Sequence, residues 1–296
     1  MADSRRRFLK TAAWGAAGAA RLRGAAKTVP PIRIRDKTVS RLVAGGNPIG
    51  GYSYGTSNFT KHMLSYFTVE RITGYLLHAE EEGINTFQSH YATNVRDALL
   101  AARDAGCKIQ WICLTSESTG ELKPALALHP LAVSHHGGVT DRFFREGKPD
   151  KVHDFVKQVR DAGVLAGISL HNPDNLARIE DSGWENDFYM ACFYNLTRTP
   201  EDIKATLGQG VLGPVFFESD PERMTRRIRE VKKPCLGFKI LGAGRLASNA
   251  SSLDRAFAFA YSSIKPSDGV IVGMFPVFAD EIRENADLAR KHGAPA

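Results

Sequence analysis

Short apolar runs recur eight times between residues 41 and 274. Each run has the length of a β-strand and is apolar almost without interruption, which is typical of strands that are covered on both faces of a parallel sheet. The runs occupy residues 41–46, 84–88, 109–115, 131–135, 164–170, 187–194, 235–241 and 269–274. We therefore predict eight buried strands.

Helical patterns fill intervals between the runs, and their ends carry residues suited to helix termini. Thr68 begins one helix, and Asn172 followed by Pro173 begins another. Asp220 and Pro221 repeat the second arrangement, so Asp220 is expected to be a helix cap. The patterns cover residues 68–83, 150–163, 172–183, 219–231, 252–264 and 279–293.

The alternation of strands and helices predicts one α/β domain, because no tract rich in Pro, Gly or Ser divides the series. Eight strands with helices between them favour a single (β/α)8 TIM barrel over residues 27–296. The active site of that fold lies at the C-terminal ends of the strands. Polar side chains that follow the apolar runs are therefore the candidates for chemistry.

The first 26 residues form a separate unit, which we interpret as a twin-arginine export signal. Residues 4–10 read SRRRFLK, with paired Arg5 and Arg6, and a short stretch of small residues follows. That stretch is too short to span a bilayer, so we expect cleavage after Ala20 or Ala26 and no permanent membrane span. The expected partner is the twin-arginine export machinery, and the expected location is the periplasm or the cell exterior.

Composition argues against two classes of protein. Removal of residues 1–26 takes away six Lys or Arg and one Asp, which lowers the formal net charge from +7 to +2, so we do not expect a nucleic-acid-binding protein. The four cysteines include no CxxC pair, which argues against a zinc ribbon or a thioredoxin-type site. We expect buried free thiols instead.

Polar residues cluster where the predicted strands end. The second strand ends in Gln88, Ser89, His90 and Tyr91, and the fourth ends in His135 and His136. With His171 after the fifth strand, four of the nine histidines fall at one end of the predicted barrel. The remaining strand ends contribute Thr115, Ser116, Glu117, His171, Asn172, Tyr194, Asn195 and Lys239.

Several of these segments resemble the aldo/keto reductases, in the same order along the chain. The segments are RLVAGGNPIGG, EEGINTFQS, AGISLHN, YNLTR, LGAGRL and DEIRENADLA, within residues 38–292. The resemblance implies a barrel with a nicotinamide cofactor extended across the strand ends. It also implies a Tyr acid assisted by Asp, Lys and His.

Most of the catalytic tetrad implied by the resemblance is replaced here. The Asp position falls on Gln88 and the Lys position on Ser116, while the His position is kept as His135. Tyr91 takes the Tyr position only by realignment. The resemblance therefore implies the fold more strongly than the mechanism.

The cofactor contacts implied by the resemblance are kept only in part. Ser169 matches the serine that holds the carboxamide, and Tyr194 matches the ring that stacks on nicotinamide. The positions that would grip the adenosine phosphate hold Phe275, Pro276 and Glu281, although phosphate needs cations and backbone donors. We do not expect tight NAD(P) binding.

The first functional hypothesis is a metal-dependent enzyme for a sugar or other carbonyl substrate. His90, His135 and His171 would hold zinc, manganese or iron, because imidazoles on neighbouring strands suit such ions. Glu117 or Glu218 would be a fourth ligand or a base. The metal would serve isomerisation, epimerisation or elimination. In the alternative reading each histidine makes local hydrogen bonds without a metal.

Two other hypotheses remain open. One is a diverged nicotinamide-dependent reductase that uses His135, with or without Tyr91, as its acid. The other is a small-molecule binding protein that has lost catalysis. The residues expected to contact a small-molecule substrate are Gln88, His136, Asn172, Asn195 and Arg245.

Lys239 has three possible roles. A desolvated lysine on a barrel strand can form a Schiff base with a carbonyl group. It can also pair with Glu218 or Gln88 across the mouth, or bind a substrate carboxylate. The glycine-rich turn that follows, LGAGRL, would let the backbone approach a ligand closely.

Overall fold

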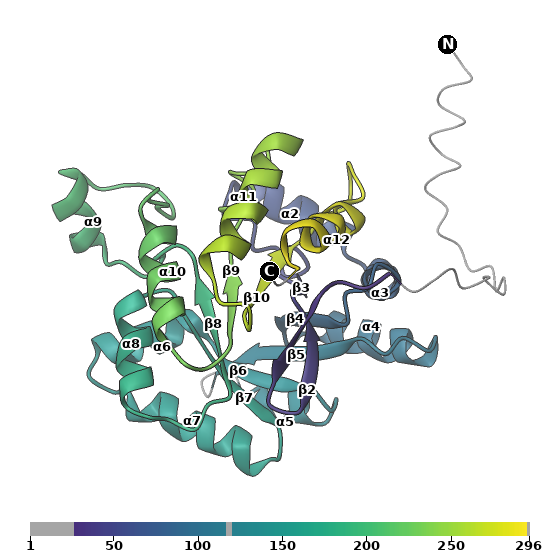
Figure 1. The fold of residues 1–296 in the computed structure, drawn as a ribbon, viewed down its shortest axis with the longest axis horizontal. Helices are drawn as coiled ribbons and strands as arrows, with labels where there is room; N and C mark the ends of the chain where they lie inside the picture. Colours follow the sequence, from purple (N-terminus) through teal and green to yellow (C-terminus); the bar gives the residue numbers. More distant parts are fainter. Residues whose placement is uncertain (1–26, 117–119, 295–296) are drawn as a thin grey trace.

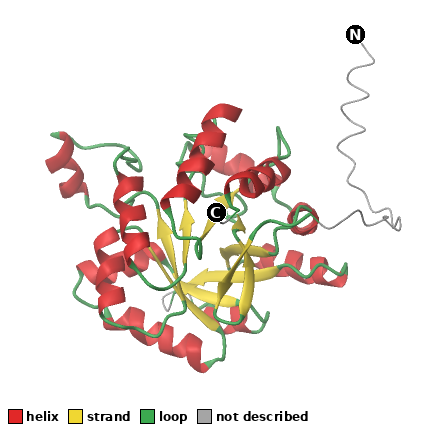
Figure 2. Ribbon diagram, viewed as in Figure 1, coloured by secondary structure: helices red, strands yellow, loops and turns green. Residues whose placement is uncertain are grey.

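The computed structural model describes residues 27–116 and 120–294. The predicted export signal and Glu117 lie outside the described residues. Eight parallel strands close into a barrel in the order β10-β3-β4-β5-β6-β7-β8-β9, which confirms the predicted (β/α)8 architecture. Figure 2 shows the strands at the centre with helices around them.

All eight predicted strands are present, with ends trimmed by a few residues. Each strand is strongly apolar and pairs in parallel with a strand on either side, so the eight strands form one closed sheet. The barrel strands are β3 (Leu42–Gly45), β4 (Thr86–His90), β5 (Gln110–Thr115), β6 (Ala132–His135), β7 (Leu165–Leu170), β8 (Phe188–Cys192), β9 (Cys235–Phe238) and β10 (Gly269–Gly273).

Helices connect the strands and cover the outside of the barrel (Figure 1). They are α2 (Ser57–Tyr66), α3 (Val69–Glu81), α4 (Thr93–Asp104), α5 (Leu122–Leu126), α6 (Gly137–Arg145), α7 (Asp150–Asp161), α8 (Pro173–Asp181), α9 (Pro200–Leu207), α10 (Asp220–Glu230), α11 (Ala250–Ser263) and α12 (Glu281–His292). No helix among the described residues is long and apolar enough to cross a membrane.

Two of the predicted helix starts carry the expected caps. The Thr68 side chain accepts a hydrogen bond from Arg71 N, and the Asn172 side chain accepts one from Asp174 N. Such bonds satisfy backbone donors that have no partner within the helix. Pro173 occupies the first turn of α8, where its missing N–H costs nothing.

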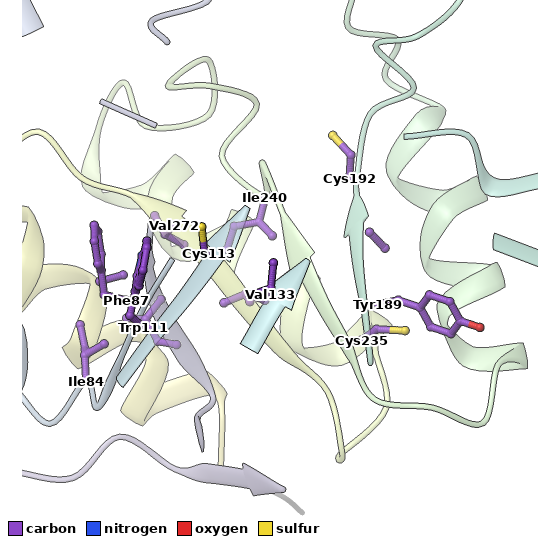
Figure 3. Packing of buried hydrophobic residues seen from close by; sticks show 14 of the residues in the cluster. Ile84, Phe87, Trp111, Cys113, Val133, Tyr189, Cys192, Cys235, Ile240 and Val272 are labelled. Atoms are coloured by element: carbon purple, nitrogen blue, oxygen red, sulfur yellow. The ribbon is translucent and has the colours of Figure 1, made fainter. Parts of the chain in front are cut away.

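The apolar core has two parts, one on each side of the strands. Between the barrel and the helices lies a large cluster that includes Phe87, Trp111 and Tyr189; Figure 3 shows part of its packing. Inside the barrel lies a smaller cluster that includes Ile112, Phe188 and Met190. The alternation of side chains along a strand assigns successive residues to one cluster or the other.

A hairpin that the sequence analysis did not identify closes the N-terminal end of the barrel. Strands β1 (Pro31–Ile34) and β2 (Lys37–Ser40) pair in antiparallel fashion. Their buried side chains Ile32, Ile34 and Val39 belong to the interior cluster. The hairpin fills the bottom of the barrel with apolar side chains, which leaves the opposite end for chemistry.

Candidate functional site

Register decides which polar side chains face the barrel interior. Gln88 pairs with Ile112, and His90 pairs with Leu114, which in turn pairs with Ser134. Ile112 and Leu114 belong to the interior cluster. Neighbouring residues in a parallel sheet point to the same face, so Gln88, His90 and Ser134 also face the interior. They lie toward its C-terminal end, which we call the mouth.

Three histidines gather at the mouth: His90, His136 and His171. The rings of His90 and His136 are 5.4 Å apart between centroids, and the His171 ring lies 5.6 Å from that of Phe238. Burial, followed by the charges of His90 and His171, lowers the pKa of His136 to about 4. Burial and the charge of Lys239 lower the pKa of His90 to about 4. His90 and His136 are therefore neutral imidazoles at neutral pH.

His135 does not lie with the other histidines. Its register partner on β7 belongs to the cluster between barrel and helices. The His135 ring lies 5.0 Å from that of Phe155 on α7, and its Nδ1 is 2.7 Å from Thr140 Oγ1. The expectation that His90, His135 and His171 converge on one ion is wrong, because His135 occupies the opposite face of its strand.

The predicted metal site does not fit the observed arrangement. Within residues 27–116 and 120–294, no group of three or more His, Cys, Asp and Glu side chains is placed to hold a metal ion. Glu218, the predicted fourth ligand, is exposed before α10. We therefore derive no chemical step through zinc, manganese or iron.

Lys239 follows β9 and places its amine at the mouth. Its Nζ lies 3.4 Å from the centroid of the Tyr54 ring, and the residue is only 9% exposed. Burial lowers the pKa of Lys239 to about 8 against an opposing effect of Cys192, and the charge of Arg245 adds a smaller lowering effect. A substantial fraction of this amine is therefore neutral near pH 8, in contrast to an ordinary lysine.

The backbone at Lys239 is unusual. Its φ is +60°, in the left-handed region that side chains other than glycine rarely adopt. Such a conformation costs about 1–2 kcal/mol and is enriched at functional sites. This turn ends the alternation of inward and outward side chains along β9 just after Phe238. It thereby directs the Lys239 amine into the mouth.

Several buried polar atoms at the mouth have no hydrogen-bond partner within residues 27–116 and 120–294. They are Gln88 Nε2, Ser134 Oγ, His136 Nδ1 and His171 Nδ1. Gln88 is 5% exposed and Ser134 is fully buried. His171 Nδ1 is 3.3 Å from a carboxylate oxygen of Asp141, but the angle does not make a hydrogen bond. An unsatisfied buried group costs about 1–3 kcal/mol, so these atoms favour a site for a polar ligand.

Aromatic side chains from two loops cover the mouth. The Tyr52 ring is 5.1 Å from the His90 ring, and Tyr54 lies over Lys239. Phe216 contacts Tyr54 with ring centroids 6.4 Å apart. Arg245 lies 4.0 Å over the Phe216 ring. We call Tyr52, Tyr54 and Phe216 the aromatic cover.

Asp141 on α6 fixes the loops beside the histidines. It is buried and accepts hydrogen bonds from His171 N (2.7 Å), Asn175 Nδ2 (2.8 Å) and Thr197 Oγ1 (2.9 Å). The carboxylate therefore joins α6 to the ends of β7 and β8. The hydrogen bonds that the Asp141 carboxylate accepts therefore stabilise the loops that line the site.

Asp220 has a different role from the predicted helix cap. Ser219 is the N-cap of α10, and Asp220 is the first residue of the helix. Its carboxylate forms an ion pair with Arg198 (Nη1 to Oδ2, 2.8 Å) and accepts a bond from Asn195 N (3.2 Å). The prediction was wrong because a partly buried arginine, Arg198, binds this carboxylate.

The two predicted cofactor contacts are both buried. Ser169 faces the interior near Gly137, where an added Cβ would lie 2.9 Å from its Oγ. The Tyr194 ring packs against Phe216 at 4.9 Å and lines a hollow of about 200 Å³ beside α11.

The other predicted substrate and catalytic residues lie at the rim or outside it. Asn172 uses its side-chain oxygen to cap α8. Asn195 accepts hydrogen bonds from Thr197 within its own loop. Tyr91 packs against the outer cluster and lies beside Arg96 of α4. Neither Tyr91 nor His135 is thus positioned among the mouth histidines.

Phe275 and Glu281, at positions where the resemblance implies binding of the adenosine phosphate, make contacts within the protein instead. Phe275 packs against the rings of Phe59, Tyr66 and Phe67 at 5.2–5.8 Å. Glu281 accepts a hydrogen bond from Phe275 N, and burial raises the pKa of its carboxyl. Aromatic rings and a carboxylate do not suit an adenosine phosphate. The residues present do not fit NADP.

The sequence analysis did not identify Tyr54 or Cys192 as residues of the mouth. It also chose His135 as a metal ligand, although His136 is the histidine that lies at the mouth. Strict alternation along β6 would have placed His136, rather than His135, on the face of Ser134. Cys192 faces the interior in register with Phe238, and burial raises the pKa of its thiol to about 12. All four cysteines are buried and free, as predicted. No local pattern identifies Tyr54, because its loop is held by contacts distant in sequence.

No protein-family model matches this chain, and no curated protein matches it. Solved structures do match. A truncated 3-deoxy-D-arabino-heptulosonate 7-phosphate synthase from Thermotoga maritima aligns with a TM-score of 0.52 and 12% identity over 89% of this chain and 91% of that one. A Gox0644 mutant in complex with NADPH aligns with a TM-score of 0.51 and 11% identity over 89% and 88%.

The glycerol dehydrogenase AKR11B4 from Gluconobacter oxydans matches with a TM-score of 0.46 and 13% identity, over 92% of this chain and 98% of that one. The predicted resemblance to aldo/keto reductases is confirmed as a likeness of fold by the match to the Gox0644 mutant with NADPH. Identities of 11–13% support no transfer of residue roles. What the chain shares with these structures is the (β/α)8 barrel.

Proposed function

We propose that this protein is an enzyme that binds a small carbonyl compound, a sugar or a related molecule, at the mouth and reacts with it through Lys239. The observation that carries the proposal is the position of this amine. It lies 9% exposed among neutral imidazoles, over the Tyr54 ring, on a residue with φ +60°. Perturbed lysines in such clefts act as nucleophiles.

The proposed chemistry is imine formation. The neutral Lys239 amine adds to the carbonyl carbon and gives a carbinolamine, which loses water to give the imine. Protonation of the imine makes it an electron sink, so a neighbouring C–H or C–C bond is weakened. Isomerisation, epimerisation and elimination all become accessible by this route, which preserves the reaction classes predicted from the sequence without a metal.

The surrounding side chains would orient the substrate. His90 and His136 are neutral and can donate or accept hydrogen bonds, although their low pKa makes them weak bases. Gln88 and Ser134 offer unpartnered polar atoms deeper in the barrel. Substrate hydroxyl groups would satisfy these atoms, which supports a polyhydroxylated carbonyl compound over an apolar one.

Reductive trapping tests the proposal. The protein is incubated with glycolaldehyde or pyruvate and sodium borohydride, and the labelled peptide is identified by mass spectrometry. We expect the adduct on Lys239 and its loss in Lys239→Met. The initial trapping rate should rise about tenfold per pH unit below pH 8 and level off above it, because only the neutral amine attacks.

Lys233 provides the internal control, since its amine already donates to Trp184 O. Adducts spread over surface lysines, with none on Lys239, would overturn the imine mechanism. Substrate binding without trapping would favour the non-catalytic binding protein. NADPH-dependent reduction of the same carbonyl compounds would favour the diverged reductase.

We also propose that the chain is exported through the twin-arginine pathway. Support comes from the SRRRFLK segment, which carries the paired arginines that the pathway requires. The double substitution of Arg5→Lys and Arg6→Lys should leave the precursor in the cytoplasm, as measured by cell fractionation and immunoblotting. Normal export of the double variant would contradict the proposal.

A further inference from the structure

Two cations at the mouth, Lys239 and Arg245, form no ion pair with a carboxylate of residues 27–116 or 120–294. Among the residues that the structure describes, no Asp or Glu lies within ion-pair distance of Lys239 or Arg245. Arg198, by contrast, is paired with Asp220. Unpaired cations held close together repel each other, as the effect of Arg245 on Lys239 indicates. A bound anion would relieve this repulsion.

The loop after β9 brings the two cations together. Gly242, Ala243 and Gly244 all have positive φ values, of 56°, 55° and 88°. Hydrogen bonds from Gly242 N to Lys239 O (2.8 Å) and from Arg245 N to Gly242 O (3.4 Å) close successive turns. The chain is thereby folded back so that Arg245 returns to the mouth six residues after Lys239.

Contacts with the aromatic cover hold Arg245 in place. Its guanidinium lies 4.0 Å over the Phe216 ring, and its Nη2 is 3.4 Å from Tyr54 O. Tyr54 also contacts Lys239 through its ring. Both cations therefore touch one residue. Among the residues that the structure describes, the Arg245 side chain donates only to the backbone oxygens of Tyr54 and Gly242, which leaves other donors of its five N–H groups for a ligand.

We propose that the substrate carries a carboxylate or a phosphate close to its carbonyl group, and that Arg245 binds this anionic group while Lys239 attacks the carbonyl carbon. The inference rests on the proposed imine chemistry. An arginine fork matches two oxygens of a carboxylate or phosphate, and the aromatic face behind it fixes its plane. A neutral sugar would leave the exposed guanidinium to solvent alone.

Matched probe pairs test the inference by reductive trapping at Lys239. Pyruvate is compared with hydroxyacetone, and glyceraldehyde 3-phosphate with glyceraldehyde, at equal concentrations and pH 8. We expect at least tenfold faster trapping of the anionic member of one pair, and the pair that shows it identifies carboxylate or phosphate. Arg245→Gln should remove most of that preference, measured as the ratio of the two trapping rates within each pair, and Arg245→Lys should restore part of it.

Arg255→Gln on α11 is the matched control, because Arg255 is also an exposed arginine and donates to Ser251 Oγ within its own helix. It should keep the preference. Equal trapping of charged and neutral probes, or a preference that survives Arg245→Gln, would overturn the anionic substrate and leave the imine proposal intact. Absence of any adduct on Lys239 with all four probes would instead overturn the imine proposal, and the inference with it.

Discussion

The two ends of the barrel are built from opposite kinds of side chain. At the N-terminal end, the β1–β2 hairpin inserts Ile32, Ile34 and Val39 into the interior. Polar groups there are mostly paired; for example, Gln110 Nε2 donates to Thr38 O at 2.9 Å. Among the described residues, Asn186 Oδ1 is the one buried acceptor near that end without a partner. The bottom is a stabilising plug.

The mouth differs from the N-terminal end because it is lined by polar side chains. Imidazoles, an amine, an amide and a hydroxyl converge on it, and four of their polar atoms have no partner in the part of the chain that the structure describes. Lys239 also carries a strained backbone conformation. These features lower the stability of the fold. A folded protein retains them where ligand binding offsets their energetic cost. The difference between the two ends indicates that stability resides at the bottom and chemistry at the mouth.

Removal of apolar volume at the bottom should give the largest effect. Ile34 is fully buried in the interior cluster. Ile34→Ala is expected to lower the free energy of unfolding by about 2–5 kcal/mol, because it loses apolar burial and leaves a cavity. Urea denaturation followed by circular dichroism measures this change.

Arg33→Ala on the exposed face of the same strand is the control and should change stability by less than about 0.5 kcal/mol. Trapping at Lys239 should be retained in Ile34→Ala under conditions in which the variant is folded. A loss below about 1 kcal/mol would show that the hairpin does not act as a plug, and the comparison between the ends would fail.

The fold was predictable from sequence because its signals are local and repeated. Eight continuous apolar runs and helix caps such as Thr68 and Asn172 determine the strand and helix order without long-range information. The β1–β2 hairpin was missed because its strands are only four residues long and each buries only two of its side chains. Asp220 was misassigned because its partner, Arg198, lies 22 residues away.

The site was only partly predictable, since it depends on which face each side chain takes. His135 and His136 are adjacent in sequence, yet one packs against Phe155 and the other against His90. A one-residue shift in register exchanges such faces. The contact between Tyr54 and Lys239 joins loops 185 residues apart along the chain, so no sequence window contains it.

Replacement of an unpartnered polar group at the mouth should give a smaller effect of opposite sign. Gln88 Nε2 is buried without a hydrogen-bond partner, and its register neighbour inside the barrel is Ile112. Gln88→Leu keeps similar volume and removes the unsatisfied donor. We expect the free energy of unfolding to rise by about 1 kcal/mol, and trapping of hydroxylated carbonyl probes at Lys239 to slow.

Gln110→Leu is the matched control from the other end of the barrel, because its amide donates to Thr38 O. Loss of a satisfied hydrogen bond should lower stability by about 1 kcal/mol, so the same chemical change should have opposite signs at the two ends. Both variants are compared in one series of urea denaturations. If Gln88→Leu destabilises the protein as Gln110→Leu does, the amide of Gln88 supports the fold, and the mouth loses one of the atoms that we assign to the substrate.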